Sequence, residues 1–235
     1  MVVDESKVDV IIGCPVRHRE WILWDWFEYA EKAAQVAGVD ASYAFVVNPQ
    51  DAGVIEVLES TPDSTILMVD EEDLPDVRVW NEDRYEHMAF LRNSLLWEVR
   101  RRKPKFFLSL DSDILIHPEC LANLIESSLQ YDAVGGRTYM SAGRWCPSFS
   151  YLFPNGGLNR LDVDDVRLVD VIMGIKLMTP KAYAINYKSH DQGEDIGWSK
   201  NCRQNHVSLG VDGRVINKHV MDPAQLHEID ERCGY

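Results

Sequence analysis

Short apolar runs alternate with longer amphipathic segments through the first half of the chain. The short runs predict buried strands, and the longer segments, whose apolar residues recur at helical spacing, predict helices. We expect strands at 8–13, 42–47, 65–69 and 106–110, separated by helices at 21–36, 53–60 and 82–102. Because strand and helix alternate along this half, we expect a mostly parallel, doubly wound α/β sheet.

The pattern changes in the second half of the chain. A helix is predicted at 119–130, and strand-like runs then follow at 133–140, 149–153, 166–173 and 175–178. A helix is expected to start at 180–185, another opens at Glu194, and one or two strands fall within 207–219. Strands that follow one another with few helices between them favour a smaller antiparallel part beside the parallel sheet.

Two carboxylates follow the fourth predicted strand, in Asp111-Ser112-Asp113. Acids at positions i and i+2 of an extended or tightly turning backbone can point the same way. Mg²⁺ and Mn²⁺ prefer oxygen ligands, and ligands of open α/β sheets bind at the carboxyl ends of the strands. The pair is therefore a candidate binding site for a metal and a diphosphate. The alternative interpretation is an ordinary solvated turn, because Asp is common in turns.

Composition narrows the class of protein. The chain has 235 residues, which suits one large α/β domain or two small ones, and its net charge of −14 opposes broad binding to nucleic acid. The five cysteines are widely spaced and form no Cys-x-x-Cys pair, so we expect free thiols in a reducing compartment. We see neither a signal peptide nor an apolar run of membrane-spanning length, and we expect a cytoplasmic protein.

The acid pair and several other segments, taken in order, resemble the glycosyltransferases of GT-A fold. The resemblance is nearest to the large inverting group called family 2, with local similarity to the β-1,4-galactosyltransferases. It covers almost the whole chain and implies a single GT-A domain over 1–235, with a nucleotide-binding half (1–118) and an acceptor-binding half (119–235). The segments that carry it, besides 111–113, are Pro15-Val16-Arg17-His18-Arg19-Glu20, Arg92-Asn93, Gly193-Glu194-Asp195-Ile196-Gly197-Trp198 and Asn217-Lys218-His219.

This resemblance implies a donor site for a nucleotide diphosphate sugar, with a UDP-sugar favoured. Asp113 is the more direct metal ligand, Asp111 and His219 complete the metal set, and the ion is Mn²⁺ or Mg²⁺. One departure concerns the base: the family usually has Asp-Asp-Gly-Ser after the second strand, and this chain has Asn48-Pro49-Gln50-Asp51. The residues assigned to the nucleotide sugar are Pro15, Arg17, Arg19, Asp51, Arg92, Asp111 and Ser112.

The same resemblance assigns the acceptor side. Inverting enzymes need a base that takes the proton of the attacking hydroxyl, and Asp195, the second acid of the Glu-Asp motif, fits that role. Glu194 would bond acceptor hydroxyls, and Trp198 would offer an apolar platform to a sugar ring. The Gln-x-x-Arg-Trp motif of processive synthases is missing, so we expect transfer of a single sugar.

The sequence is also compatible with three other functions. A retaining GT-A transferase would share the acid pair. A sugar-1-phosphate nucleotidyltransferase would also carry metal-binding acids on an α/β sheet, but should have a Gly-rich, lysine-containing segment near its start, where this chain has Gly13 alone. A non-catalytic nucleotide- or sugar-binding module is the third alternative. The acceptor, whether a glycan, small molecule, protein or modified nucleobase, and the oligomeric state are not specified by the sequence.

Overall fold

The structure is a computed structural model and describes residues 8–70, 81–140, 150–152, 159–160 and 163–226. Strands and helices alternate in the first half as predicted, and the predicted bounds of α3 and β4 are confirmed. In this half the elements are β1 (Val10–Val16), α1 (Glu20–Ala37), β2 (Ala41–Val47), α2 (Ala52–Glu59), β3 (Ser64–Met68), α3 (Glu82–Arg102) and β4 (Phe106–Leu110).

In the second half, short strands outnumber helices in the described ranges. The elements are β5 (Ile114–Leu115), α4 (Cys120–Ser127), β6 (Ala133–Met140), β7 (Ser150–Leu152), β8 (Asn159–Arg160), β9 (Val166–Leu168), β10 (Val171–Ile172), β11 (Ile175–Met178), α5 (Pro180–Tyr183), α6 (Glu194–Gln204), β12 (Leu209–His219) and a 3₁₀ turn (Pro223–Gln225). The strand predicted at 149–153 is confirmed over Ser150–Leu152, and its two end residues lie outside the described part of the chain.

Helix ends follow the local chemistry of the chain. The side chain of Asn81 caps α3 by accepting a hydrogen bond from the backbone of Arg84. Acidic residues occupy the first turn of α3 and arginines its last turn, as the helix dipole favours. Helix α1 is followed by Gly38 as its C-cap, whose φ of 64° is left-handed and suits glycine. These signals are visible in the sequence, which explains why the ends of the long helices were predicted closely.

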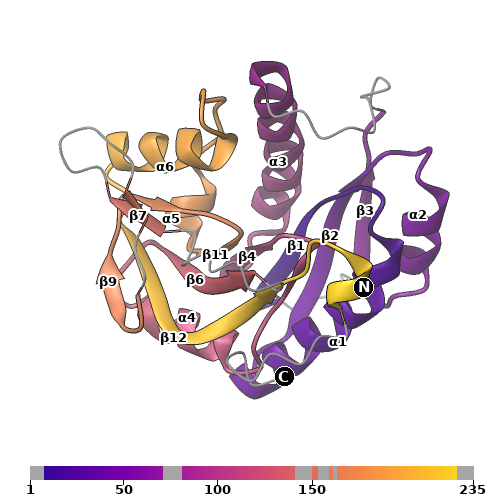
Figure 1. Ribbon diagram of the computed structural model, residues 1–235, viewed down its shortest axis with the longest axis horizontal. Coiled ribbons are helices and arrows are strands. Elements are labelled where there is room, and N and C mark those ends of the chain that lie inside the picture. Colours follow the sequence, from indigo (N-terminus) through magenta and orange to yellow (C-terminus); the bar gives the residue numbers. More distant parts are fainter. Residues whose placement is uncertain (1–7, 71–80, 141–149, 153–158, 161–162, 227–235) are drawn as a thin grey trace, which may run out of the picture.

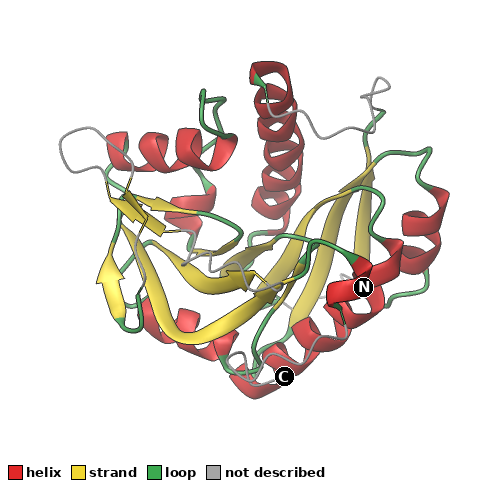
Figure 2. Ribbon diagram, in the orientation of Figure 1, coloured by secondary structure: helices red, strands yellow, loops and turns green. Residues whose placement is uncertain are grey.

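The main sheet has the order β3-β2-β1-β4-β11-β6-β12-β5 in the described residues, with β9 also paired to β12. Strands β3, β2, β1 and β4 are parallel, whereas β11 enters antiparallel between β4 and β6. A small antiparallel sheet has the order β10-β7-β8. The predicted fold class, a mostly parallel α/β sheet with a smaller antiparallel part, is confirmed (Figure 2).

Helices cover both faces of the main sheet. Helices α3, α5 and α6 lie above it in Figure 1, and α1 and α4 lie below it. Side chains of β4 alternate between the two layers: Leu108 and Leu110 pack in the core with α1 and α4, whereas Phe107 packs in the core with α3 and α6. By the same alternation Ser109 and the residue after the strand, Asp111, face the α3 and α6 side. The site is built on that face.

Several predicted bounds differ from the observed ones for physical reasons. Strand β1 runs on to Val16, where a loop was expected from residue 14, because β2 pairs with it over its whole length while β4 pairs only as far as Gly13. At Pro15, β1 therefore pairs with β2 alone. Such a position tolerates proline, which has no backbone N–H to donate to a second neighbouring strand. The strand predicted at 166–173 is two strands, because β9 pairs with β12 and β10 pairs with β7.

Two findings bear on the composition. Cys14, Cys120 and Cys202 are free thiols and are buried, while the other two cysteines lie outside the described residues. Across the part of the chain that the structure describes, no helix combines the length and the apolar character needed to cross a membrane.

Candidate active site

The Asp111-Ser112-Asp113 segment forms a tight turn at the carboxyl end of β4. The backbone N–H of Ile114 donates to the Asp111 carbonyl at 3.0 Å, and the indole of Trp26 donates to the same carbonyl at 3.2 Å. The Asp111 N–H donates to the Gly174 carbonyl at 3.1 Å. The backbone of the turn is therefore fixed from three sides, while the side chains of Asp111 and Asp113 keep 29% and 15% of their surface exposed.

Asp113 is brought together with two predicted site residues that are distant in sequence. Its Oδ2 lies 3.2 Å from Nη2 of Arg19, and its Oδ1 lies 3.3 Å from Nε2 of His219. His219 reaches this position because the end of β12 pairs with β5, which follows the turn directly, so that His219 lies opposite Ile114. The Val220 N–H donates to the Asp113 carbonyl at 2.7 Å, which holds the end of β12 against the turn.

The donor atoms around Asp113 fit a divalent cation that also binds a substrate phosphate. Within the described ranges, no cluster of three or more Cys, His, Asp or Glu side chains is arranged to hold a metal, so the predicted set of Asp111, Asp113 and His219 is not gathered into one cluster. Asp113 and His219 do converge, 3.3 Å apart, and both keep a small exposed fraction. Mg²⁺ is commonly bound by one or two carboxylates and completes its shell with water and substrate phosphates, and imidazole suits the transition metals. This pair can therefore supply the protein's share of such a shell.

The loop between β1 and α1 carries the other predicted donor residues. Arg19 is 8% exposed and its guanidinium also lies over the ring of Trp21, whereas Arg17 is half-buried and donates to the neighbouring His18 ring. The buried carboxylate of Asp51, at the start of α2, accepts a 2.6 Å hydrogen bond from the His18 N–H. Asp51 thus ties the ends of β1 and β2 together at the same edge of the sheet.

Arg92 joins the Asp111-Ser112-Asp113 turn to the Glu-Asp motif. It projects from α3 and is 5% exposed. Its Nη2 donates to Oδ1 of Asp111 at 2.9 Å, its Nη1 to Ser109 at 3.3 Å, and its Nε to Oε1 of Glu194 at 3.0 Å. Burial opposes its charge, but the carboxylates of Asp111, Asp195 and Glu194 outweigh burial and raise the pKa of Arg92. Arg92 is therefore a permanent cation between two acid pairs.

Glu194 and Asp195 open helix α6, directly after its N-cap residue Gly193. Both are buried, and their side chains extend to cations from other elements. The Nζ of Lys176 on β11 donates to Oδ1 of Asp195 at 2.6 Å, and Nε of Arg92 lies 3.9 Å from the same oxygen. Helix-start chemistry alone does not explain this pair, since their charges are compensated by side chains and not only by the helix dipole.

The two neighbouring acids have pKa values shifted in opposite directions. Burial raises the pKa of Glu194, the negative charge of Asp195 adds to the rise, and Arg92 opposes it. Burial also acts to raise the pKa of Asp195, but Lys176 and Arg92 outweigh it, so that the pKa of this carboxyl is lowered. Environments that separate the pKa values of two adjacent acids are a common feature of sites for acid–base chemistry.

Lys176 and Tyr187 belong to this cluster and were not predicted from the sequence. The ring of Tyr187 lies 5.6 Å from the cationic groups of both Arg92 and Lys176, and burial raises its pKa to about 12. Lys176 is 0% exposed. A signal for it exists in the sequence: a lysine stands inside the apolar run 175–178, and lysine is almost never fully buried unless it is paired.

Trp198 does not lie where the resemblance led us to expect it. Its side chain is 0% exposed, its ring stacks on Tyr187 with 5.6 Å between centroids, and its indole donates to the Ile185 carbonyl at 3.2 Å. It contributes to the core between α6 and the sheet. A fully buried ring offers no face to an acceptor sugar, so we leave Trp198 out of the proposed acceptor site.

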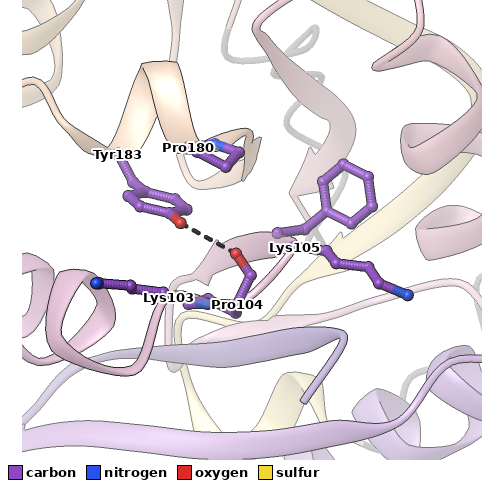
Figure 3. Close-up of a pocket in the computed structure, with 6 residues that line it drawn as sticks. Lys103, Pro104, Lys105, Pro180 and Tyr183 are labelled. Carbon is purple, nitrogen blue, oxygen red and sulfur yellow. Dashed lines mark hydrogen bonds between the residues drawn. The ribbon is translucent and has the colours of Figure 1, made fainter. Parts of the chain in front are cut away.

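An open groove of about 670 Å³ lies at the opposite end of β4 (Figure 3). It is lined by residues that precede β4 or begin it and by two residues of α5, and the Tyr183 hydroxyl donates to the Pro104 carbonyl at 3.0 Å. The acids follow the carboxyl end of β4, whereas this groove lies at its amino end. It is therefore separate from the candidate active site.

Comparison with solved structures identifies the fold class. S. aureus TarS in complex with UDP superposes with a TM-score of 0.59 at 12% identity, covering 92% of this chain and 62% of that one. The catalytic domain of Drosophila β1,4-galactosyltransferase 7 in complex with xylobiose gives 0.51 at 11% identity, covering 95% and 76%. The inositol-1-phosphate CTP transferase from T. maritima gives 0.54 at 14% identity, covering 94% and 93%.

These likenesses show the fold, which is that of GT-A-type nucleotide-sugar transferases and related nucleotidyltransferases. The chain spans about three fifths of the length of the TarS chain that it matches. No protein-family model matches the chain, and no curated protein is similar to it in sequence. The predicted resemblance to the GT-A fold is thus confirmed at the level of structure.

Proposed function

We propose that this protein transfers one sugar from a nucleotide diphosphate sugar to an acceptor hydroxyl, with a divalent metal and with inversion at the sugar carbon. The observation that carries the proposal is the placement of two acid pairs on one edge of a GT-A-type sheet, joined by Arg92 through Asp111 and Glu194. One pair suits a diphosphate with its metal, and the other suits an attacking hydroxyl.

On the donor side, Asp113 and His219 would hold Mn²⁺ or Mg²⁺, while the carboxylate of Asp111 stays bound to Arg92. The ion would act as a Lewis acid that stabilises the negative charge developing on the diphosphate leaving group. Arg19, now 3.2 Å from Asp113, carries a guanidinium suited to the diphosphate oxygens. The loop that holds Pro15 and Arg17 and the end of β2 at Asp51 would enclose the nucleotide, with Ser112 at the ribose and diphosphate. A UDP-sugar is the favoured donor, and the TarS neighbour was solved with UDP.

On the acceptor side, Asp195 would accept the proton of the attacking hydroxyl. A new bond forms between the acceptor oxygen and the sugar carbon, the bond from that carbon to the diphosphate breaks, and the proton moves to the carboxylate. Positively charged neighbours keep Asp195 ionised and ready to accept a hydrogen bond. Glu194, one residue away and bound to Arg92, would orient the acceptor through its hydroxyls.

Titration calorimetry with UDP and GDP, each with and without Mn²⁺, tests the donor site. Because a bound Mn²⁺ offsets the negative charges of the diphosphate and of Asp113, we expect it to tighten binding of one nucleotide by at least about tenfold, which corresponds to about 1.4 kcal/mol. Asp113→Asn should remove this gain. The matched control is Asp165→Asn, which removes the same charge from an exposed residue outside the site. Absence of metal-dependent binding to either nucleotide by the wild-type protein would reject the proposal.

The T. maritima CTP transferase favours a second candidate, because the match covers nearly all of both chains. A nucleotidyltransferase must hold a triphosphate, usually with a glycine-rich loop after the first strand. Here β1 ends at Val16 and α1 begins at Glu20, so the loop is only Arg17-His18-Arg19, without glycine. This observation supports the glycosyltransferase. Adding CTP to the same titrations separates the two, since tighter Mn²⁺-dependent binding of CTP than of UDP or GDP would favour the nucleotidyltransferase.

A further inference from the structure

Lys176 is a fully buried cation in the middle of the main sheet. Strand β11 pairs antiparallel with β4, and Lys176 lies directly opposite Ser109. Both side chains face α3 and α6, where the Nζ of Lys176 donates to Oδ1 of Asp195 at 2.6 Å. The lysine side chain therefore extends from β11, inside the sheet, to the first turn of α6. It connects the strand next to β4 with Asp195.

The turn that leads into β11 contacts the acids on both sides of the site. The Gly174 carbonyl accepts from the Asp111 N–H at 3.1 Å, and the Gly174 N–H donates to the Asp195 carboxylate. Gly174 has a φ of +70°, a left-handed conformation that glycine adopts without strain. Lys176, two residues further on, adds the ionic contact to Asp195. One short segment thus fixes the backbone of the donor-side turn and the side chain of the acceptor-side acid.

Stability alone does not account for a buried lysine at this position. Taking an ammonium and a carboxylate out of water costs several kcal/mol per ion, and apolar residues of similar volume are often as stable or more so. The neighbours on β11, Ile175, Leu177 and Met178, show that the strand otherwise uses apolar core residues. Packing alone therefore does not explain the Lys176–Asp195 ion pair. Asp195 is also the base in our proposed function.

Resting on that proposed function, we propose that Lys176 is a positioning residue, which holds the Asp195 carboxylate ionised and in one orientation toward the acceptor hydroxyl. The other charged or titratable groups at this cluster are Arg92 from α3, Asp111 from the turn after β4, Tyr187 from the segment before α6, and Glu194. Lys176 keeps its own proton, because the charge of Asp195 outweighs burial and raises the pKa of the lysine. Proton acceptance therefore stays with Asp195.

The direct test follows the carboxyl carbon of Asp195 by NMR as pH is lowered, with the signal assigned by its loss in Asp195→Asn. An opposite charge in contact lowers the pKa of a carboxyl by about one to three units. We expect Lys176→Met to move the titration upward by about that amount, and Lys176→Arg, which keeps the charge, to reverse most of the change. An Asp195 titration that is the same in Lys176→Met as in the wild type overturns the proposal.

If Lys176→Met does not fold, the double variant Lys176→Met/Asp195→Asn decides the question. Recovery of a cooperative unfolding transition in the double variant would show that the lysine acts on the charge of Asp195. A double variant as unstable as Lys176→Met would overturn the proposal, because the lysine would then serve packing alone.

Nucleotide binding separates this inference from the proposed function. In folded Lys176→Met, Mn²⁺-dependent binding of UDP or GDP should stay within about twofold of the wild type, since the donor side is intact. Release of that nucleotide from its sugar donor should fall at least tenfold and recover in part in Lys176→Arg. If the wild-type protein binds neither nucleotide, the proposed function fails, whereas the Asp195 titration still decides the role of Lys176.

Discussion

Two pairs of acidic side chains lie at the same edge of the sheet, and they differ in exposure and in the side chains that contact them. Asp111 and Asp113 occupy a turn after β4 and keep 29% and 15% of their side-chain surface exposed. Glu194 and Asp195 open α6 and keep 9% and 7%. Arginines and a histidine contact the first pair, whereas the second pair contacts Arg92 and the fully buried Lys176.

The difference indicates what each pair can do. A partly exposed carboxylate can exchange an arginine partner for a metal ion or share it with a phosphate, at little cost in desolvation. A buried carboxylate with a buried partner cannot change partners without leaving a charge uncompensated. Asp111 and Asp113 are therefore suited to ligands that bind and dissociate, and Glu194 and Asp195 to a fixed geometry in which protonation is the variable.

The largest effect is expected from Arg92→Met, because Arg92 binds an acid of each pair. Its loss leaves the buried Glu194 without its 3.0 Å partner and removes the partner of Asp111 at the same time. Removing one member of a buried ion pair costs about 3–5 kcal/mol. We expect a loss of that size in the free energy of unfolding, measured by urea denaturation.

Arg167→Met is the matched control for this variant. Arg167 and its partner Asp165 are both exposed, at 46% and 57%, and exposed ion pairs contribute little to stability. If Arg92→Met lost no more stability than Arg167→Met, the buried network would not hold the two sides of the site together, and the contrast between the two acid pairs would lose its structural basis.

A smaller effect separates the pairs by ligand binding. Asp113→Asn should lower Mn²⁺-dependent affinity for UDP or GDP by at least about tenfold, by removal of a charge-assisted contact. Asp195→Asn should leave that affinity within about twofold while transfer to any acceptor is lost. Calorimetry measures the first and nucleotide release the second, with circular dichroism to verify folding. Equal losses of nucleotide affinity in both variants would mean that the four acids form one binding site and not two.

Much of the fold could be predicted because its signals are local. The bounds of α3 and β4 follow from an N-cap at Asn81, a run of arginines at the helix end and a short apolar run, all adjacent in the chain. The order of the later strands could not be predicted in this way. Strand β11 lies antiparallel between β4 and β6, and β12 lies parallel to β6, through contacts between residues far apart in sequence.

The site shows the same division. The motif residues predicted for it do converge in part: Asp113 lies beside Arg19 and His219, and Arg92 contacts both acid pairs, although their roles stay predictions. Lys176 was not predicted because its role depends on contacts with β4 and α6, which are distant in sequence. Trp198 was assigned by its neighbours in the chain, and helical spacing does place it on the face of α6 that carries Glu194 and Asp195. That face is buried there, and the ring stacks on Tyr187 in the core, which the sequence alone does not show.

The smallest effect lies within the acceptor-side pair and concerns pH. The pKa of Glu194 is raised above its ordinary 4.5, first by burial and then by Asp195, so the folded state holds this proton more tightly than the unfolded state. Stability from Glu194 is therefore full below pH 4.5 and is lost as pH rises through the folded value. For Asp195 burial is outweighed by Lys176 and Arg92, and its pKa lies below its ordinary 3.8. Its stability is present above pH 3.8 and is lost as pH falls.

Thermal unfolding of Glu194→Gln and Asp195→Asn across acidic to neutral pH tests this contrast. The melting temperature of the wild type minus that of Glu194→Gln should decrease as pH rises from about 4.5, whereas the difference for Asp195→Asn should increase as pH rises through the acidic range. Each kcal/mol corresponds to about 2–4 °C for a chain of this size, and we expect slopes of a few degrees at most. Slopes of the same sign would mean that the neighbouring acids share one environment, and that Lys176 does not distinguish Asp195 from Glu194.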